Sequence, residues 1–467
     1  FKPNPAKQSI MVTCDDEGRS VLIRIYSIDG LGNFDYCETY ALVQNNLNTA
    51  CENAVGSGII AGIIRTEQLK PVEDVKTQLS GQRSGVDQTD IQGQYGFNSL
   101  QLGYDYTVTP TLDERPLNGV STFDLVLITR HILSIQPLTS PYQLIAADAN
   151  NSKNITILDL IALRKLILSV DLQFANNTSW RFVDAKYQFP VPSNPWSQPF
   201  PEIININDLQ GQITDADFVA IKIGDIDGNA RTNNALGTEI RTTHGTFAFQ
   251  VADEQLTTGN EYIVEFKAKD LATIQGYQGT LTFDPTKVEL VNIVSGIVKE
   301  ENFGFRFVNE GAITTSWHNM SVNKGKNTDE LLFSLILRAK ADTQLSKTLS
   351  VSSRYTASEA YNQTDELLNV AIEFSNGQII GNEFELYQNT PNPFKGSTVI
   401  GFNMPAAADA TITISDITGK VVKLIRGSYG KGFNQEVLNS SELPSGVLTY
   451  TLQSGEFTAT KKMIIMD

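Results

Sequence analysis

Alternating apolar and polar residues predict β-strands at both ends of the chain. Near the N-terminus, residues 21–26 and 40–43 are strand-like, and the glycine-rich segment Asp29–Asn33 between them suits a hairpin turn. If the turn centres near Leu31, the numbers of two residues paired across this hairpin sum to about 62. Further strand-like runs predict three more β modules, over residues 58–110, 243–380 and 384–467.

The middle of the chain has a different period. Residues 123–133 and 158–168 place apolar side chains at helical spacing, and the two segments resemble each other. The sequence therefore predicts an internal duplication of a unit made of a loop followed by a helix. Residues 172–207 are rich in proline and aromatic residues, and we expect them to form a rigid strap that lies on the duplicated helices.

Composition excludes several classes of function. The formal net charge of the 467 residues is −16, which argues against binding to nucleic acid. No run of 18 apolar residues occurs, so we expect no transmembrane segment. The motifs of common hydrolases and nucleotide-binding enzymes are absent, and His131 and His318 are expected to be packed or capping residues. We therefore predict that the chain is not an enzyme.

The cysteines and the first residue suggest an exported fragment. All three cysteines lie within the first 51 residues, and the predicted hairpin favours a disulfide between Cys14 and Cys51. Cys37 would then pair upstream of Phe1, although three free buried thiols are the alternative. The chain starts at Phe1 without a signal segment, and we expect it to be the C-terminal part of a longer protein.

A twelve-residue segment before the second helix has the spacing of a calcium-binding loop. Oxygen-bearing side chains fall at positions 1, 3, 5, 9 and 12, and position 7 offers its carbonyl oxygen. A carboxylate at position 12 also lies at the favourable N-terminal end of a helix. The alternative is a capped helix after a polar turn. The predicted calcium ligands are Asp148, Asn150, Ser152, Asn154, Thr156 and Asp159.

The first copy of the loop is degenerate, because Arg115 and Leu117 occupy two ligand positions. A distant segment supplies the missing half of such a loop, with no helix after it. We therefore predict a second calcium site in which the two halves complement each other, although an Asp-rich turn is the alternative. Its predicted residues are Asn118 and Asp124 from the first copy and Asp225, Asp227 and Asn229 from the distant segment.

These features resemble known extracellular modules. The duplicated loop and helix, with the strap and the ending Ile221–Asn229, resemble a type I dockerin domain over residues 111–232. The run Gly276–Leu290 resembles cohesin-type sandwiches and assigns residues 243–380 to that class. Because dockerins grip cohesins through their helix faces, the two modules are expected to pair either within one chain or between neighbouring molecules.

The outer modules have resemblances of their own. Residues 1–52 resemble the end of an immunoglobulin-like, hyalin-type sandwich, and residues 58–110 resemble prealbumin-like spacer modules. Residues 384–467 are similar to the type A C-terminal sorting domain of type IX secretion substrates in Bacteroidota, through Pro391–Phe394 and the closing Lys461–Asp467. This resemblance implies export across the outer membrane through the type IX translocon, with the sorting domain either cleaved or retained.

The combined expectation is a mainly β chain of tandem sandwiches in an elongated array, with one small α-helical calcium domain. We expect a non-catalytic, calcium-stabilised adhesin or appendage subunit at the cell surface. It would self-assemble into a homo-oligomer or fibre and contact a target-cell surface or polysaccharide. Two alternatives remain, an accessory region of an extracellular hydrolase and a carbohydrate-binding protein. Exposed tryptophans on one face would favour the latter.

Overall fold

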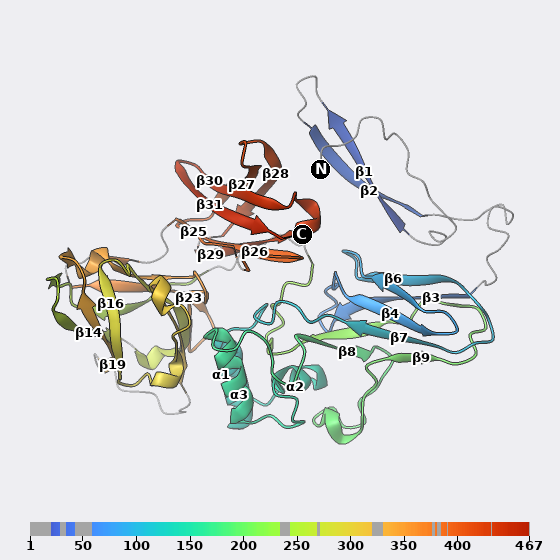
Figure 1. The fold of residues 1–467 in the computed structure, drawn as a ribbon. Helices are drawn as coiled ribbons and strands as arrows, with labels where there is room; N and C mark the ends of the chain where they lie inside the picture. The colour runs from blue at the N-terminus through green and yellow to red at the C-terminus, as the bar shows by residue number, and fades with distance from the viewer. Residues whose placement is uncertain are drawn as a thin grey trace.

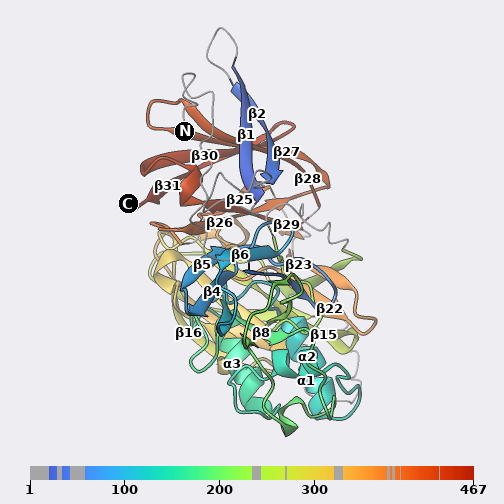
Figure 2. The same ribbon diagram turned by 90° about the vertical axis from the view of Figure 1, so that its right-hand side faces the viewer.

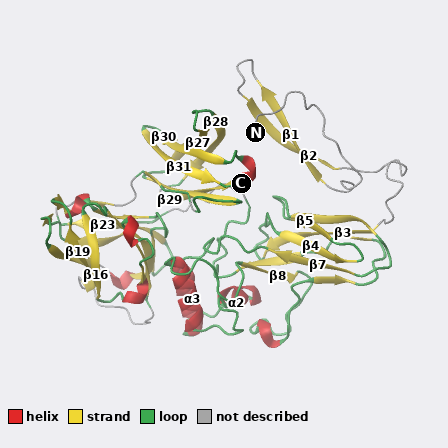
Figure 3. Cartoon of the chain, viewed as in Figure 1, coloured by secondary structure: helices red, strands yellow, loops and turns green. Residues whose placement is uncertain are grey.

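The computed structural model is dominated by strands, and the three α-helices of its described residues gather in one small region (Figures 1 and 3). The predicted mainly β fold with tandem sandwiches is therefore confirmed. Within the described residues, no helix is long and apolar enough to cross a membrane. The structure describes residues 20–28, 34–42, 58–233, 243–268, 271–319, 330–375, 379–380, 384–389, 391–430 and 432–466.

The predicted N-terminal hairpin is present. Strands β1 (Ser20–Ile28) and β2 (Phe34–Leu42) pair antiparallel, and Ser20 lies opposite Leu42. The numbers of the paired residues sum to 62 at every step of the register, which confirms the predicted turn. Cys37 lies on β2 opposite Ile25, whereas the predicted disulfide partners Cys14 and Cys51 lie outside the described residues.

The next module is a two-sheet sandwich that draws its strands from two parts of the chain. One sheet has the order β10-β3-β11-β8, with β6 also paired to β3, and the other has the order β5-β4-β7-β9. The strands are β3 (Gly58–Thr66), β4 (Lys76–Gly81), β5 (Gly85–Gln88), β6 (Gln94–Leu100), β7 (Tyr106–Thr111), β8 (Trp180–Asp184), β9 (Ile204–Ile206), β10 (Gln212–Ile213) and β11 (Phe218–Lys222).

This arrangement corrects the division expected between residues 110 and 111. Strands β8 to β11 lie within residues 111–232, yet they complete both sheets of the sandwich that begins at Gly58. Strand β11 pairs with β3 and β8, and its Phe218 is buried in the same core as Ile64. The apolar face of β3 therefore needs cover that residues 58–110 alone do not supply.

The helical region confirms the internal duplication. Helices α1 (Thr122–Ile132) and α3 (Ile157–Ile167) both start with a capping box, formed by Ser121 with Asp124 and by Thr156 with Asp159. In each box the cap hydroxyl and the carboxylate satisfy backbone N–H groups of the first turn. Helix α2 (Pro141–Ala147) lies between them in the sequence, and buried side chains of all three helices form one core.

The aromatic strap covers the helical core, but its ring contact is with α2, which lies between the two duplicated helices that were expected to carry it. The ring of Phe189 packs edge-on against Tyr142 of α2, with the centroids 5.5 Å apart, and also contacts Tyr187 and Phe200. Trp196, in the short 3₁₀ helix η2 (Pro195–Ser197), packs against the same core. The strap thus covers the helical core while its flanking strands β8 and β9 join the neighbouring sandwich.

The cohesin-like sandwich follows, and its strands form one eleven-stranded sheet plus the β13–β20 pair. Its core is rich in stacked aromatic rings and includes Phe266, Phe333 and Trp317. The strands are β12 (Thr246–Val251), β13 (Gln255–Leu256), β14 (Glu261–Ala268), β15 (Ile274–Phe283), β16 (Val288–Ser295), β17 (Phe303–Gly304), β18 (Ala312–His318), β19 (Glu330–Ala339), β20 (Thr343–Gln344), β21 (Leu349–Ser352), β22 (Glu359–Asn362), β23 (Leu367–Phe374) and β24 (Ile379–Ile380).

The C-terminal module is a smaller sandwich of two sheets, with the orders β25-β26-β29 and β28-β27-β30-β31. The hydroxyl of the buried Tyr450 accepts a hydrogen bond from Asn389 N and donates one to Tyr387 O, which fixes the start of the module on β30. The strands are β25 (Glu385–Leu386), β26 (Ser397–Met404), β27 (Ala408–Asp416), β28 (Val421–Tyr429), β29 (Gly432–Asn439), β30 (Gly446–Ser454) and β31 (Phe457–Ile465).

Five further 3₁₀ helices connect the strands. They are η3 (Leu271–Thr273), η4 (Glu300–Asn302), η5 (Val308–Glu310), η6 (Leu345–Lys347) and η7 (Ser440–Glu442).

The helices dock on the cohesin-like sandwich of the same chain. Helix α1 lies beside β15 and β18. Figure 2 shows α1 next to β15. Phe123 of α1 stacks on Tyr361 of β22, with the ring centroids 5.1 Å apart. Of the two pairings that the sequence left open, the structure therefore contains the one within the chain.

A buried histidine lies at this interface. His318 Nε2 is 3.0 Å from Thr129 Oγ1 of α1, and its Nδ1 is 3.2 Å from a guanidinium nitrogen of Arg164 on α3. Burial, and secondarily the charge of Arg164, lower the pKa of His318 from its ordinary value of 6.5 to about 3. The folded chain therefore keeps this imidazole neutral.

We predict that replacing Phe218 by alanine destabilises the sandwich and the helical region together. Phe218 is 1 % exposed, so the free energy of unfolding should fall by about 3–5 kcal/mol. Val219→Ala, on the same strand but half-buried, is the control and should cost about 1 kcal/mol. Calorimetry should show residues 58–233 melting in one transition. Separate transitions for residues 58–111 and 112–233 would contradict the shared sheets.

We also predict acid sensitivity at the helix–sandwich interface. Below pH about 6.5 the unfolded chain protonates His318, whereas the folded chain does so only near pH 3. The free energy of unfolding contributed by this group is therefore lost as the pH falls through that window. In thermal melts between pH 7.5 and pH 4.5, His318→Gln should lose less stability than the parent chain. Equal losses in the two proteins would refute this assignment.

Candidate metal centre

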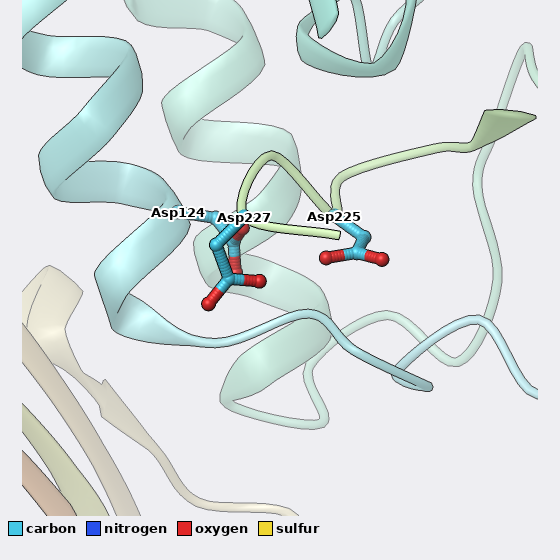
Figure 4. Close-up of side chains that lie close together, drawn as sticks. All are labelled: Asp124, Asp225 and Asp227. Carbon is cyan, nitrogen blue, oxygen red and sulfur yellow. The ribbon is translucent and has the colours of Figure 1, made fainter. Parts of the chain in front are cut away.

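Three carboxylates from distant parts of the sequence meet near the start of α1. Asp124 belongs to the first turn of α1, whereas Asp225 and Asp227 lie in the loop that follows β11. One carboxylate oxygen of each lies within 4.8 Å of those of the other two. Figure 4 shows the three side chains gathered at the helix end. The structure thus brings together these three residues of the predicted second calcium site.

The backbone of the loop holds this arrangement. Asp124 Oδ1 accepts a hydrogen bond of 2.7 Å from Ile226 N, which ties the loop to α1. Asp225 accepts hydrogen bonds from Gly228 N and Asn229 N on one oxygen and from Ala230 N on the other. The carboxylate of Asp225 therefore sits inside its own turn, in the same way as the first ligand of a calcium loop.

Burial and mutual repulsion disfavour the charged forms of this carboxylate cluster, and the buried ammonium group of Lys222 offsets them only in part. Asp124 is fully buried, and the pKa of its carboxyl is raised well above the ordinary value by burial and by the charges of Asp227 and Asp225. Burial, followed by the charge of Asp227, raises the pKa of Asp225 to about 7. A bound divalent cation would favour the charged forms of both groups.

Asn229 supplies a further oxygen. Its Nδ2 donates to Asp227 Oδ2, while its Oδ1 is buried and has no hydrogen-bond partner within the described part of the chain. Asn118 behaves differently from the prediction that grouped it with the ligands. Both polar atoms of its side chain bond the backbone of Arg231, at 2.7 and 3.0 Å. Asn118 therefore fastens the end of the loop.

The complete calcium-type loop predicted over residues 148–159 closes on two carboxylates. The buried Asp148 accepts hydrogen bonds of 2.8 Å from Ser152 N and from Lys153 N, one on each oxygen. Asp159 Oδ1 accepts from Asn150 N at 3.1 Å, so the last predicted ligand reaches back to the third position. Asn151 adopts a positive φ of 57°, which bends the chain around these carboxylates.

The remaining residues of this loop contribute oxygens in different ways. Asn150 Oδ1 accepts from Ser152 N, and Ser152 Oγ donates to Asn154 O at 3.1 Å. Thr156 is the N-cap of α3, and its hydroxyl accepts from Leu158 N. The six predicted residues thus form one curled loop, and the atoms that they could offer to a metal ion are all oxygens.

The donor sets of both loops fit a hard cation. They consist of carboxylate, amide, hydroxyl and backbone oxygens, which suit calcium or magnesium, whereas zinc and copper favour sulfur or imidazole ligands. Loops that combine carboxylates with amide, hydroxyl and backbone oxygens suit the larger and less directional calcium ion better than magnesium. The residues that would hold calcium in the predicted second site are Asp124, Asp225, Asp227 and Asn229.

Sequence reasoning missed two residues that support the loop after β11 from outside. Lys70 Nζ, next to β3, donates to Gly228 O at 3.0 Å, and Gln143 of α2 donates to Ile226 O at 3.1 Å. Neither residue lies in a recognisable motif, so only the three-dimensional arrangement identifies it. His131 Nδ1 accepts a hydrogen bond from Leu138 N, and this histidine therefore caps a turn.

The fold and site can now be compared with solved structures. Part of the chain is similar to one chain in the solved structure of a type I cohesin–dockerin complex from Clostridium thermocellum, with 12 % identity over 28 % of this chain and 99 % of that chain and a TM-score of 0.22. It also resembles the seventh ScaB type I cohesin from Pseudobacteroides cellulosolvens, with 19 % identity over 29 % of this chain and 91 % of that chain and a TM-score of 0.21. No curated protein matches.

The C-terminal sandwich has the clearest relationship. Residues 389–466 match the family described as "Secretion system C-terminal sorting domain". This matched range includes Pro391–Phe394 and the final strand β31, where the sequence resemblance was strongest. The match marks the chain for type IX export to the cell surface or the extracellular space.

Proposed function

We propose that this chain is the non-catalytic, calcium-stabilised part of a surface adhesin or extracellular appendage subunit. The observation that supports this proposal best is the meeting of Asp124, Asp225 and Asp227 within 4.8 Å. These carboxylates come from segments about a hundred residues apart in the sequence. A cation bound between them would tie the two segments together, which is a structural role. The sorting domain supplies the route of export, and the tandem sandwiches supply length and stiffness.

Calcium would act by fixing α1 to the loop after β11. That loop continues from a strand of the first sandwich, while α1 docks on the cohesin-like sandwich. A cation at this point would therefore make two sandwiches and the helices between them into one stiff body. Because the carboxylates repel one another without a cation, binding free energy would add directly to folding free energy.

Neither alternative function gains support from the tryptophans and histidines. Trp180 and Trp317 lie in the cores of the two sandwiches, and Trp196 packs against the helical core. This distribution does not suit a row of exposed rings for binding a sugar. His131 accepts a hydrogen bond from the backbone of Leu138, and His318 bonds Thr129 at the helix–sandwich interface, as expected of structural histidines.

Self-assembly belongs to the same proposal, but it has to use surfaces other than the helix–sandwich contact. The face of the cohesin-like sandwich at β15 and β18 is already covered by the chain's own α1. We therefore propose that a homo-oligomer or fibre forms through the outer sandwiches, and that the assembly contacts a cell surface or polysaccharide.

We predict that calcium raises the melting temperature of the purified chain and that Asp227→Asn removes part of this effect. A ligand at a hundredfold excess over its Kd adds about 2.7 kcal/mol of stability. The variant should also be more stable than the parent chain in chelator, because one repelling charge is gone. Isothermal titration should show two calcium ions per parent chain, and a single ion for Asp227→Asn.

The matched control is Asp215→Asn. Asp215 is an exposed carboxylate that pairs with Lys186, outside both loops. This variant should bind two calcium ions and melt like the parent chain in calcium and in chelator. If the parent chain melts at the same temperature with calcium and with chelator, the proposed stabilising role is wrong.

We further predict that the calcium-loaded chain forms a concentration-dependent oligomer and adheres to cells or to immobilised polysaccharide. Light scattering measures the first property, and retention on the surface measures the second. A chain that stays monomeric and unretained with saturating calcium would refute both the adhesive and the assembling role. Hydrolysis of polysaccharide or protein by the purified chain would refute the non-catalytic proposal.

A further inference from the structure

The sorting domain (residues 384–467) presents its smaller sheet to the rest of the chain. In Figures 1 and 2 strands β26 and β29 lie on the side of this module that faces the helical region. Strand β29 is the outer strand of that sheet, next to β26. Because an outer strand has one row of backbone groups without a partner strand, proteins commonly cover such an edge with another segment. The edge of β29 is therefore a place where residues 58–380, the body of the chain, can hold this module.

Arg231 of the body reaches this edge. Its Nη1 donates a hydrogen bond of 3.4 Å to Gln435 O of β29, and its Nε donates to Asn233 O at 3.2 Å. The backbone of Arg231 is fixed by Asn118, which accepts a hydrogen bond from its N–H group and donates one to its carbonyl oxygen. The arginine is thus anchored in the body, while its side chain binds the sorting domain.

Tyr387 makes the reverse connection, from the sorting domain to the cohesin-like sandwich. Its hydroxyl accepts a hydrogen bond of 3.1 Å from the N–H group of Ser353, which directly follows β21. Both residues are only 3 % exposed. The backbone of Tyr387 is fixed in the sorting domain, because its N–H group donates to Gly401 O and its carbonyl oxygen accepts from the Tyr450 hydroxyl. The two modules cannot move apart without breaking the buried hydrogen bond to Ser353.

Charged groups meet at a third point of the boundary. Burial raises the pKa of Asp74, which lies in the loop before β4, whereas the charge of Arg115 lowers this pKa. The charge of Glu442, in η7 of the sorting domain, raises it again. Glu442 also forms an ion pair with Lys423 of β28. Two cationic side chains therefore accompany the two carboxylates that approach each other across the boundary.

These contacts act at a distance from the covalent connection between the modules. Strand β24 ends at Ile380 and β25 begins at Glu385, whereas Gln435 is 204 residues from Arg231 in the sequence. Two modules joined only by their connecting segment are expected to move relative to each other. Two anchored side chains, which bind two different parts of the body, oppose such a motion.

We propose that the sorting domain is a docked part of the finished protein, bound to the body through Arg231 and Tyr387 independently of the peptide connection. Each hydrogen bond of this kind contributes about a two- to tenfold change in an equilibrium constant, and a buried partner left unpaired costs more. The two contacts together should therefore hold the sorting domain after the connection is cut. This inference goes beyond the proposed function, and it depends neither on bound calcium nor on adhesion.

Cutting the connection in the full chain tests this proposal. A recognition site for a specific protease, inserted between Ile380 and Phe384, allows the cut to be made under native conditions. A denaturing gel measures the extent of cutting, while size-exclusion chromatography and native mass spectrometry measure retention of the C-terminal fragment. We expect this fragment to elute with the body, since at about 10 µM protein a Kd of about 1 µM keeps most of it bound.

Two variants test the assignment of the contacts. Arg231→Met removes the donor to β29 but keeps the backbone of residue 231, and it should weaken retention of the cut fragment severalfold. Tyr387→Phe keeps the ring but removes the acceptor of the Ser353 N–H group, and it should weaken retention about tenfold. The double variant should release the fragment at the same protein concentration.

The matched controls are Arg83→Met and Tyr106→Phe. The side chains of Arg83 and Tyr106 also donate to backbone carbonyl oxygens, but within the first sandwich and away from the sorting domain. Both control variants should retain the cut fragment as the parent chain does. Retention by the double variant as strong as that of the parent chain would overturn the inference, and so would complete release of the fragment from the cut parent chain.

A measurement on the uncut chain keeps the inference falsifiable if a variant disturbs the fold of the cut protein. Hydrogen–deuterium exchange at the Ser353 amide should be slow in the parent chain, because this N–H group is buried and bonded to Tyr387. In Tyr387→Phe the same amide should exchange about tenfold faster. Equal exchange rates of Ser353 in the two proteins would overturn the inference.

Discussion

The carboxyl group of Asp124 is the point on which the arrangement of the central modules depends. One of its oxygens caps α1 through Ser121 N, and the other accepts a hydrogen bond from Ile226 N in the loop after β11. The same side chain therefore starts a helix and fastens the end of a strand. This carboxyl group is fully buried beside two further carboxylates, so its negative charge has to be compensated by groups in the surrounding fold.

The two duplicated helices, α1 and α3, share their local hydrogen bonds but differ in their outer surfaces. The two copies keep the same caps and the same helix ends, so each retains the local hydrogen bonds that define the unit. They differ where they face outward. Thr122 of α1 bonds Ser316 of the sandwich, whereas Ile157, which lies 35 residues further on at the corresponding position of α3, is apolar and exposed. Common backbone geometry thus leaves the surfaces free to specialise.

Local patterns predicted much of this structure. The hairpin register followed from one glycine-rich turn, and the helices and the curled loop before α3 followed from residue spacing. The pairing of Asp124 with Asp225 and Asp227 was also predictable, because half a loop in one place implies its other half elsewhere. The supporting contacts of Lys70 and Gln143 were not, since they depend on packing between elements with no sequence signal.

The shared sandwich was the main feature that sequence could not anticipate. Strands β9 and β10 are only three and two residues long, which is too short for a periodic pattern. The sequence of β11 resembles an apolar end of the helical region rather than a strand of the sandwich. Their pairing with β3 and β7 is set by the long-range closure of the two sheets. Strand boundaries could be predicted where apolar and polar residues alternate over a long run. The prediction failed where only tertiary contacts define a strand.

This interleaving has a consequence for synthesis and for evolution. A growing chain that has produced residues 58–111 still lacks four strands of the first sandwich, and it cannot close that core until β11 is made. Folding of this region is therefore postponed by about a hundred residues. A recombination event that cuts at the apparent boundary near residue 110 would separate strands that belong together. Residues 58–233 are thus the smallest segment that can be exchanged between proteins as a unit.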